Sequence, residues 1–109
     1  MTKKIEFADQ KVIQFFEKNL KNPKTVTAVY RALCEIAQDL EDGKETEGLP
    51  KEVIKRTGFG QDITYKYLQI FRLAGLVDFG DPSFALPIKP DGLTHEQRKI
   101  FKEYLGLED

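Results

Sequence analysis

The sequence holds little of the chemistry on which enzymes and secreted proteins depend. Among its 109 residues there is one cysteine, one histidine and no tryptophan. Cys34 alone cannot form an internal disulfide, and its apolar neighbours in "ALCEIA" indicate a buried side chain rather than a nucleophile. His95 alone excludes a zinc site made from paired histidines. We therefore expect no metal, no other cofactor and no catalytic residues.

Long apolar runs are also missing. No stretch approaches the roughly 18 residues that a membrane span needs, and the start of the chain, "MTKKIEFADQ", lacks the apolar run of a signal peptide. We therefore expect a cytoplasmic protein that does not contact a membrane. The segment "GFGQD" lacks both the preceding strand and the Lys-Ser/Thr ending of a phosphate-binding loop. The sequence thus predicts a binding protein and not an enzyme.

The residues that are present fit one folded domain over 1–109. Hydrophobic residues make up 40% of the chain and charged residues 32%, which suits a single core under a polar surface. The net charge is only −1, but its distribution is uneven. Residues 49–75 contain five basic and two acidic residues, whereas 25–48 contain two basic and six acidic ones. A weakly acidic protein can therefore still offer one basic face to DNA.

Apolar residues recur at helical spacing in the first half of the chain. The pattern predicts one helix over 8–21 and a second over 24–42. Asn22 provides an N-cap for the second helix, and Pro23 suits its first position. The apolar stripe of this helix occupies positions 26, 29, 30, 33, 36, 37 and 40. Such a sustained stripe on one face predicts a core helix.

A short helix, "PKEVIKRT", follows and ends at Gly58, where a left-handed C-cap is expected. After a tight turn, a further helix covers 62–74. Thr64, Leu68 and Phe71 form its inner stripe, because their spacing of four and then three residues places them on one face. The two helices and their turn thus predict a helix–turn–helix unit.

The second half of the chain also contains the signals of a hairpin. Two β-prone runs, 76–79 and 84–88, flank the turn-forming "GDPS". A C-terminal helix over 94–105 then begins with a capping box, in which Thr94 caps the helix and Gln97 reaches back to it. We therefore expect a mainly α fold with a small β-hairpin.

One local resemblance is specific enough to name a family. Residues 49–77, "LPKEVIKRTGFGQDITYKYLQIFRLAGLV", resemble the helix-turn-helix of winged-helix DNA-binding proteins, such as the small PadR-like and MarR-like regulators. "KEVIKRTG" and "LAGLV" match most closely, and with the hairpin the resemblance covers about 24–95. It implies a winged helix-turn-helix with extra N- and C-terminal helices. The helical core would span 24–75, the helix-turn-helix 50–74 and the wing hairpin 76–88.

The resemblance also implies that double-stranded DNA is the partner. In that reading Gln69 pairs with adenine, Lys66 reaches guanine or a phosphate, and Tyr65 contacts a phosphate or a thymine methyl. The expected DNA-binding residues are Lys51, Lys55, Arg56, Gln61, Tyr65, Lys66, Gln69 and Arg72. The alternative is that these side chains form only a solvated surface.

Three acidic residues depart from the usual pattern of such families. Asp78 and Asp81 stand at the expected wing tip and would repel phosphate, so we expect little or no minor-groove contact there. Asp62 opens the second helix of the motif, where it suits N-capping and the helix dipole better than DNA contact.

The outer helices add a prediction about assembly. In similar regulators such helices commonly pair two subunits, which would place two reading helices about one DNA turn apart. The expected contributors to a homodimer interface are Phe15, Phe16, Ile100, Phe101 and Tyr104. The alternative is that these residues only complete the core of one subunit.

Two kinds of function follow. The first is sequence-specific DNA binding at the nucleoid, either in transcription regulation or in marking a plasmid or chromosomal site for segregation, as in a partition-site-binding protein. The second is a winged-helix module for protein–protein assembly, in which the acidic wing and the acidic stretch 35–47 face a basic partner.

Overall fold

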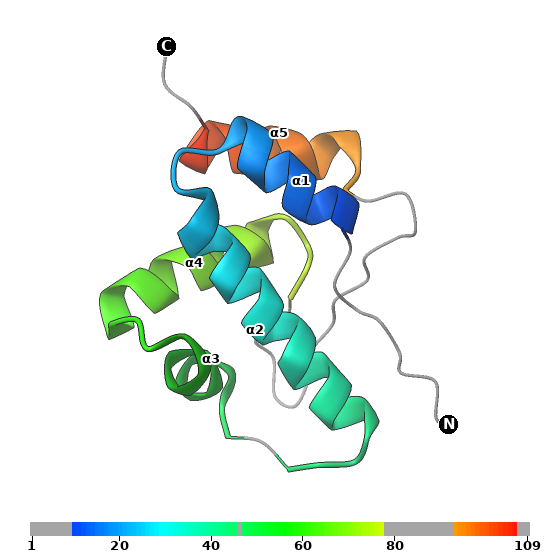
Figure 1. The fold of residues 1–109 in the computed structure, drawn as a ribbon, viewed down its shortest axis with the longest axis vertical. Coiled ribbons are helices and arrows are strands. Elements are labelled where there is room, and N and C mark those ends of the chain that lie inside the picture. The colour runs from blue at the N-terminus through cyan, green and yellow to red at the C-terminus, as the bar shows by residue number, and fades with distance from the viewer. Residues whose placement is uncertain (1–9, 46, 78–92, 107–109) are drawn as a thin grey trace.

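The computed structural model describes residues 10–45, 47–77 and 93–106. Its helices are α1 (Gln10–Asn19), α2 (Pro23–Glu41), α3 (Leu49–Thr57), α4 (Gln61–Leu73) and α5 (His95–Leu105). The helix bounds expected from the sequence agree with these to within one turn. Figure 1 shows α2 as a long diagonal helix, with α1 and α5 beside one end and α3 seen end-on beside its lower half. The helix α4 crosses close to α2 and packs against both α3 and α5.

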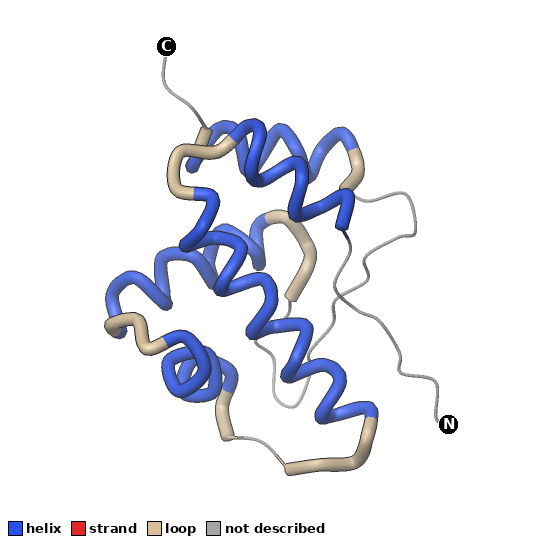
Figure 2. The backbone as a smooth tube through the Cα atoms, in the orientation of Figure 1, coloured by secondary structure: helices blue, strands red, loops and turns tan. Residues whose placement is uncertain are grey.

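The expected fold class, a winged helix with a small β-hairpin, is wrong. The described residues are 76% helical and contain no strand, as the tube in Figure 2 shows. Within them the one β-type contact is an isolated bridge between Leu20 and Gly106, which joins the ends of α1 and α5. Most of the expected hairpin, 78–88, lies outside the described residues.

The start of the expected hairpin instead forms the turn that closes the C-terminal end of α4. Gly75 has a φ of 76°, and its amide bonds to the carbonyl of Arg72. The Leu76 amide bonds to the carbonyl of Phe71, which closes the end of α4. Leu76 and Val77 are both buried, although alternate residues of an exposed hairpin would face opposite sides. The apolar side chains of Leu76 and Val77 therefore pack into the core at the end of α4.

The C-cap of α3 and the N-cap of α5 are those that the sequence predicts. Gly58, the C-cap of α3, has a φ of 78° in the left-handed region. Thr94 accepts a hydrogen bond from the Gln97 amide, and the Gln97 side chain accepts one from the Thr94 amide, so the predicted capping box is confirmed. The Gln97 side chain also donates to the carbonyl of Ala74, which ties α5 to the end of α4.

The core is a cluster of aromatic rings contributed by α1, α2, α4 and α5. Phe16 lies edge-on to Tyr30, Phe71 and Phe101, with ring centroids 5.7, 6.3 and 5.1 Å away. Tyr30 and Phe71 stack nearly parallel at 6.4 Å. Such tilted and offset pairs add about 0.5–1.5 kcal/mol each beyond burial. One cluster thus holds four helices in a fixed arrangement.

The predicted apolar stripe of α2 is confirmed except at its end. Positions 26, 29, 30, 33, 36 and 37 are buried, while Leu40 is exposed. Cys34 is buried, as its apolar neighbours predict. Within residues 10–45, 47–77 and 93–106, no helix has both the length and the apolar composition that crossing a membrane requires.

Candidate nucleic-acid interface

The outer face of α4 carries most of the residues expected to read DNA. Gln61, Tyr65, Gln69 and Arg72 are exposed and follow one another at spacings of four, four and three residues. That spacing places them on one stripe of the helix. The predicted inner residues lie on the other side, and Phe71 is among those that are fully buried. The packing of α4 therefore fixes which side chains it can present.

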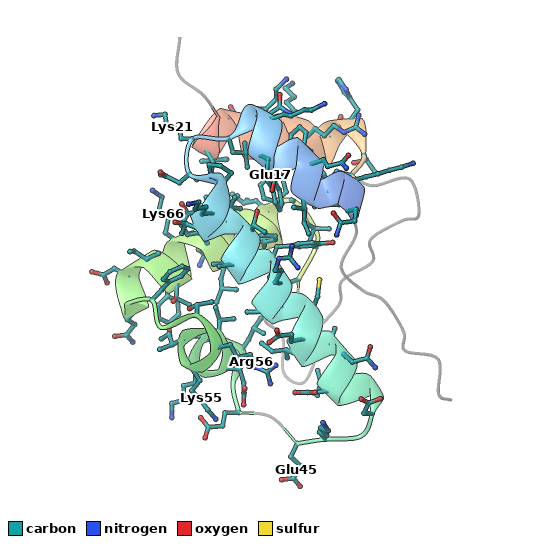
Figure 3. All side chains as sticks on the ribbon, viewed as in Figure 1. Glu17, Lys21, Glu45, Lys55, Arg56 and Lys66 are labelled. Carbon is teal, nitrogen blue, oxygen red and sulfur yellow. The ribbon has the colours of Figure 1, made fainter. Side chains whose placement is uncertain are left out.

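Lys66 lies beside this stripe, over the ring of Tyr67. Its ammonium nitrogen is 5.8 Å from the ring centroid, a distance at which cation–π attraction acts. Tyr67 is buried, and burial raises the pKa of its hydroxyl, although a hydrogen bond with Asn22 offsets part of this effect. The bond links α4 to the start of α2. Figure 3 shows Lys21, next to Asn22 in the chain, on the same side of the molecule as Lys66.

Two of the expected cations occupy the outer face of α3. Lys51 and Lys55 are both exposed. The Lys55 ammonium lies 3.7 Å from a carboxylate oxygen of Glu52 and 4.0 Å from one of Glu47. The pair with Glu47 joins two exposed side chains and contributes little to stability, whereas the Glu52 carboxylate is buried. Lys55 is therefore partly neutralised within the protein, while Lys51 has no ion pair among the described side chains.

Arg56 points in another direction and holds α3 against α2. Its Nε donates to Glu52 Oε1 at 3.2 Å, which is an i,i+4 pair within α3. One terminal nitrogen donates to Asp39 Oδ2 at 2.8 Å and the other to Glu35 Oε1 at 3.4 Å. The side chain is only 22% exposed. Arg56 thus differs from the other seven expected DNA-binding residues, because its guanidinium contacts three carboxylates of the protein.

The contacts of Arg56 change the pKa values of Asp39, Glu52 and Arg56 itself. The hydrogen bond from Arg56 lowers the pKa of the Asp39 carboxyl against the opposing effect of burial. The hydrogen bond from the Glu47 amide, 2.9 Å long, lowers the pKa of Glu52, and the bond from Arg56 adds to this. Burial acts against the charged form of Arg56, but its bonds to Asp39 and Glu52 outweigh that effect and raise its pKa. Asp39, Glu52 and Arg56 are therefore held in their charged forms.

Sequence reasoning missed this network and the Asn22–Tyr67 bond. The spacing of Glu52 and Arg56 in "EVIKR" was a usable signal, because residues four apart face each other on a helix. No local pattern pointed to Asp39, which lies 17 residues before Arg56.

Of the predictions for the three acidic residues, the structure tests only the one for Asp62. The N-capping role expected of Asp62 is wrong, because Gly60 is the N-cap of α4 and no side chain caps that helix. Asp62 does lie in the first turn, where a carboxylate interacts favourably with the helix dipole. Asp78 and Asp81 lie outside the described residues.

The residues expected at a dimer interface are divided between core and surface. Phe16 and Phe101 are fully buried within one subunit and contact each other. Phe15 and Ile100 are partly buried against the same core. Tyr104 is 55% exposed. Within one folded subunit, Tyr104 is therefore the most accessible of the five residues.

The described parts of the chain contain no cluster of three His, Cys, Asp or Glu side chains that could hold a metal ion. His95 is exposed at the start of α5, and Cys34 lies in the core. A comparison of the chain with known protein families, with curated proteins and with solved structures finds no match. The chain's own residues and their geometry must therefore indicate its function.

Proposed function

We propose that α3 and α4 act as a helix-turn-helix that binds double-stranded DNA, with α4 in the major groove. The observation that carries this proposal is the exposed stripe of Gln61, Tyr65, Gln69 and Arg72 on a helix whose other face is buried. A helix held in this way presents its polar side chains without first having to be ordered, which lowers the entropic cost of binding.

The stripe offers both base-reading and phosphate-binding groups. Gln69 has the donor and acceptor that pair with the major-groove edge of adenine. Lys66 can reach guanine or a phosphate, and Tyr65, which is 42% exposed, can contact a phosphate or a thymine methyl. These contacts would give preference for a sequence as well as general affinity.

Cations on both sides of the stripe would hold the DNA backbone. Lys51 and Lys55 stand on the outer face of α3, and Figure 3 shows Lys21, which precedes the N-cap of α2, on the same side of the molecule as Lys66. We leave Arg56 out of the interface, because moving it to a phosphate would break its bonds to carboxylates on two helices. Its role in the proposal is to fix the position of α3.

We propose further that two copies bind together and read a pseudo-palindromic site, with Tyr104 at the contact between them. A symmetric site of this kind serves both transcription regulation and the marking of a DNA locus for segregation. The two processes differ in what else binds to the complex, and both begin with the same recognition step.

A second function, the binding of a protein partner, is favoured by the apolar side chains on α4. Ile63 and Leu73 are exposed on the helix that carries Tyr65. Solvent-exposed aromatic and aliphatic side chains are typical anchors of protein interfaces. Two of the expected cations, Lys55 and Arg56, are also engaged by carboxylates.

Selection from a random duplex library at physiological salt separates the two functions. DNA binding predicts an enriched and symmetric motif. The affinity for that motif should fall as the salt concentration rises. A plot of the logarithm of the binding constant against the logarithm of the salt concentration should have a slope of about −0.9 for each phosphate contacted. Failure to enrich any motif would contradict the DNA proposal and favour a protein partner.

Substitutions on α4 test which side chains read the site. Gln69→Ala should relax the preference at one base pair, by about 1–3 kcal/mol. Lys66→Ala should weaken binding to all sequences and reduce the salt slope by about one. Lys99→Ala, an exposed cation on α5, is the matched control and should change neither quantity. Equal effects of Lys66→Ala and Lys99→Ala would remove α4 from the interface.

A further inference from the structure

A small cavity lies between α1 and α2, on residues that the proposed DNA interface does not use. Its volume is about 390 Å³. This is near the lower end of the range for small-molecule sites, roughly 300–1,000 Å³. Its lining residues are Glu17 on α1 and, on α2, Pro23, Lys24, Thr27, Ala28 and Arg31. Figure 3 shows Glu17 on the side of α1 that faces the beginning of α2.

The hollow follows from the residue sizes on one face of α2. Lys24, Ala28 and Arg31 recur at spacings of four and three residues, so their side chains share a face. The short side chains of Thr27 and Ala28 lie between two long ones. The floor of the cavity is thus made by small residues, while long charged side chains form its rim.

The charges on this rim are not neutralised by one another. Glu17, Lys24 and Arg31 form no ion pair with any side chain in the ranges that the structure covers. Elsewhere opposite charges that face each other do pair, as Arg56 does with Asp39 at 2.8 Å. One exposed carboxylate on α1 and two exposed cations on α2 therefore line the same open hollow without pairing with one another.

We propose that this cavity binds a small acidic amino acid, such as glutamate. The rim carries two positive groups and one negative group, and an acidic amino acid carries the opposite set, two carboxylates and one ammonium. Its carboxylates would lie against Lys24 and Arg31, and its ammonium against Glu17. The site is independent of the DNA-binding proposal, since none of its residues lies on α3 or α4.

Nuclear magnetic resonance titration of the full chain with three ligands tests the charge match. L-Glutamate carries all three charged groups, glutarate lacks the ammonium, and 4-aminobutanoate lacks one carboxylate. At matched pH and ionic strength, glutamate should shift the amide signals of α1 and α2 with a Kd on the order of 1 mM. Each of the other ligands should bind about fivefold more weakly, as expected for the loss of one solvent-accessible ion pair. Three equal affinities, or no shifts with glutamate at tens of millimolar, would overturn the proposal.

Substitutions of the lining residues test which side chain contacts each charged group of the ligand. Glu17→Gln should remove the preference for glutamate over glutarate, and Arg31→Met should weaken glutamate binding about fivefold. Ala28→Leu should fill the floor and block all three ligands, while the amide spectrum of α4 and α5 stays unchanged to show that the fold is intact. The matched control is Glu103→Gln, an exposed carboxylate on α5. If Glu17→Gln and Glu103→Gln have the same effect, Glu17 does not hold the ammonium and the proposal fails.

Discussion

Arg56 illustrates how an apparent surface cation can join two helices. In sequence it stands with Lys51 and Lys55 on a basic segment, and this composition suggests contact with DNA. In the structure its guanidinium bonds to Asp39 on α2 and to Glu52 on its own helix. The five donor hydrogens of a guanidinium allow it to bridge several carboxylates at once, which an ammonium does less well. Sequence indicated the charge of Arg56 but could not show the direction in which it points.

Replacing Arg56 should therefore destabilise the fold. Arg56→Met keeps much of the aliphatic stem but leaves the buried Glu52 carboxylate without its guanidinium partner. Breaking a buried ion pair costs about 3–5 kcal/mol. Because this guanidinium keeps some contact with solvent, we expect a loss of about 2 kcal/mol. Urea denaturation followed by circular dichroism measures it. Lys51→Met, an exposed control on the same helix, should stay within about 0.5 kcal/mol of the native protein, and equal losses in both variants would contradict the role of the network.

The same network predicts how stability depends on pH. Asp39 and Glu52 have a lowered pKa in the folded protein, because Arg56 and the Glu47 amide favour their charged forms. Their contribution is therefore present above the unfolded pKa of about 4 and is lost as the pH falls through the lower folded values. The free energy of unfolding should decline below about pH 4.5. In Arg56→Met this decline should be shallower, since Asp39 loses its main stabilising partner. An unchanged acid slope would show that Arg56 does not set these pKa values.

The turn between α3 and α4 could be predicted well, because it depends on local geometry. Gly58 occupies a left-handed position with a φ of 78°, which other residues adopt at a cost. Gly60 has a φ of −72° and a ψ of 169°, an extended conformation that any residue can adopt. A Cβ at either position would meet no atom within 4 Å. The two glycines therefore differ in backbone conformation and not in available space.

The same substitution at both glycines should have opposite effects. Gly58→Ser should cost about 1 kcal/mol, because serine has a Cβ in a left-handed position. Gly60→Ser should be neutral or stabilise by a few tenths of a kcal/mol, because serine is a favourable N-cap and α4 has no side-chain cap. Thermal denaturation of both variants gives the comparison. Equal destabilisation would mean that the turn is limited by packing instead of by φ.

The error at Leu76 and Val77 arose because two local patterns look alike. A short apolar run after a glycine fits the start of a strand, and it also fits the end of a helix that buries its last residues. Leu76 and Val77 belong to the second case, because the Leu76 amide completes the hydrogen bonding of α4. The sequence does show the glycine, Gly75, at which α4 ends. Which carbonyl accepts the next amide depends on three-dimensional packing.

For the molecule as a whole, the sequence predicted apolar faces but could not say which faces meet. The stripes of α1 and α5 suit a core or a dimer equally well. In the structure Phe16 on α1 and Phe101 on α5 approach to 5.1 Å, and both contact Phe71 on α4. These faces therefore complete one subunit first. Any contact with a second copy must use what remains exposed, of which Tyr104 is the clearest example.

This division of roles predicts that substitutions of Phe101 and Tyr104 on α5 have different effects. Phe101→Leu removes ring contacts with Phe16 and Phe71, and should lower the free energy of unfolding by about 1.5 kcal/mol without changing the subunit count. Tyr104→Asp alters an exposed side chain, and should shift a dimer toward the monomer because a charge is costly to bury at an interface.

Light scattering after size-exclusion chromatography, over a range of protein concentrations, measures the mass of the assembly. Urea denaturation at low protein concentration measures the stability of one subunit. A monomeric native protein would contradict the dimer. Loss of subunit stability in Tyr104→Asp comparable to that in Phe101→Leu would instead place Tyr104 among the residues that hold one subunit together.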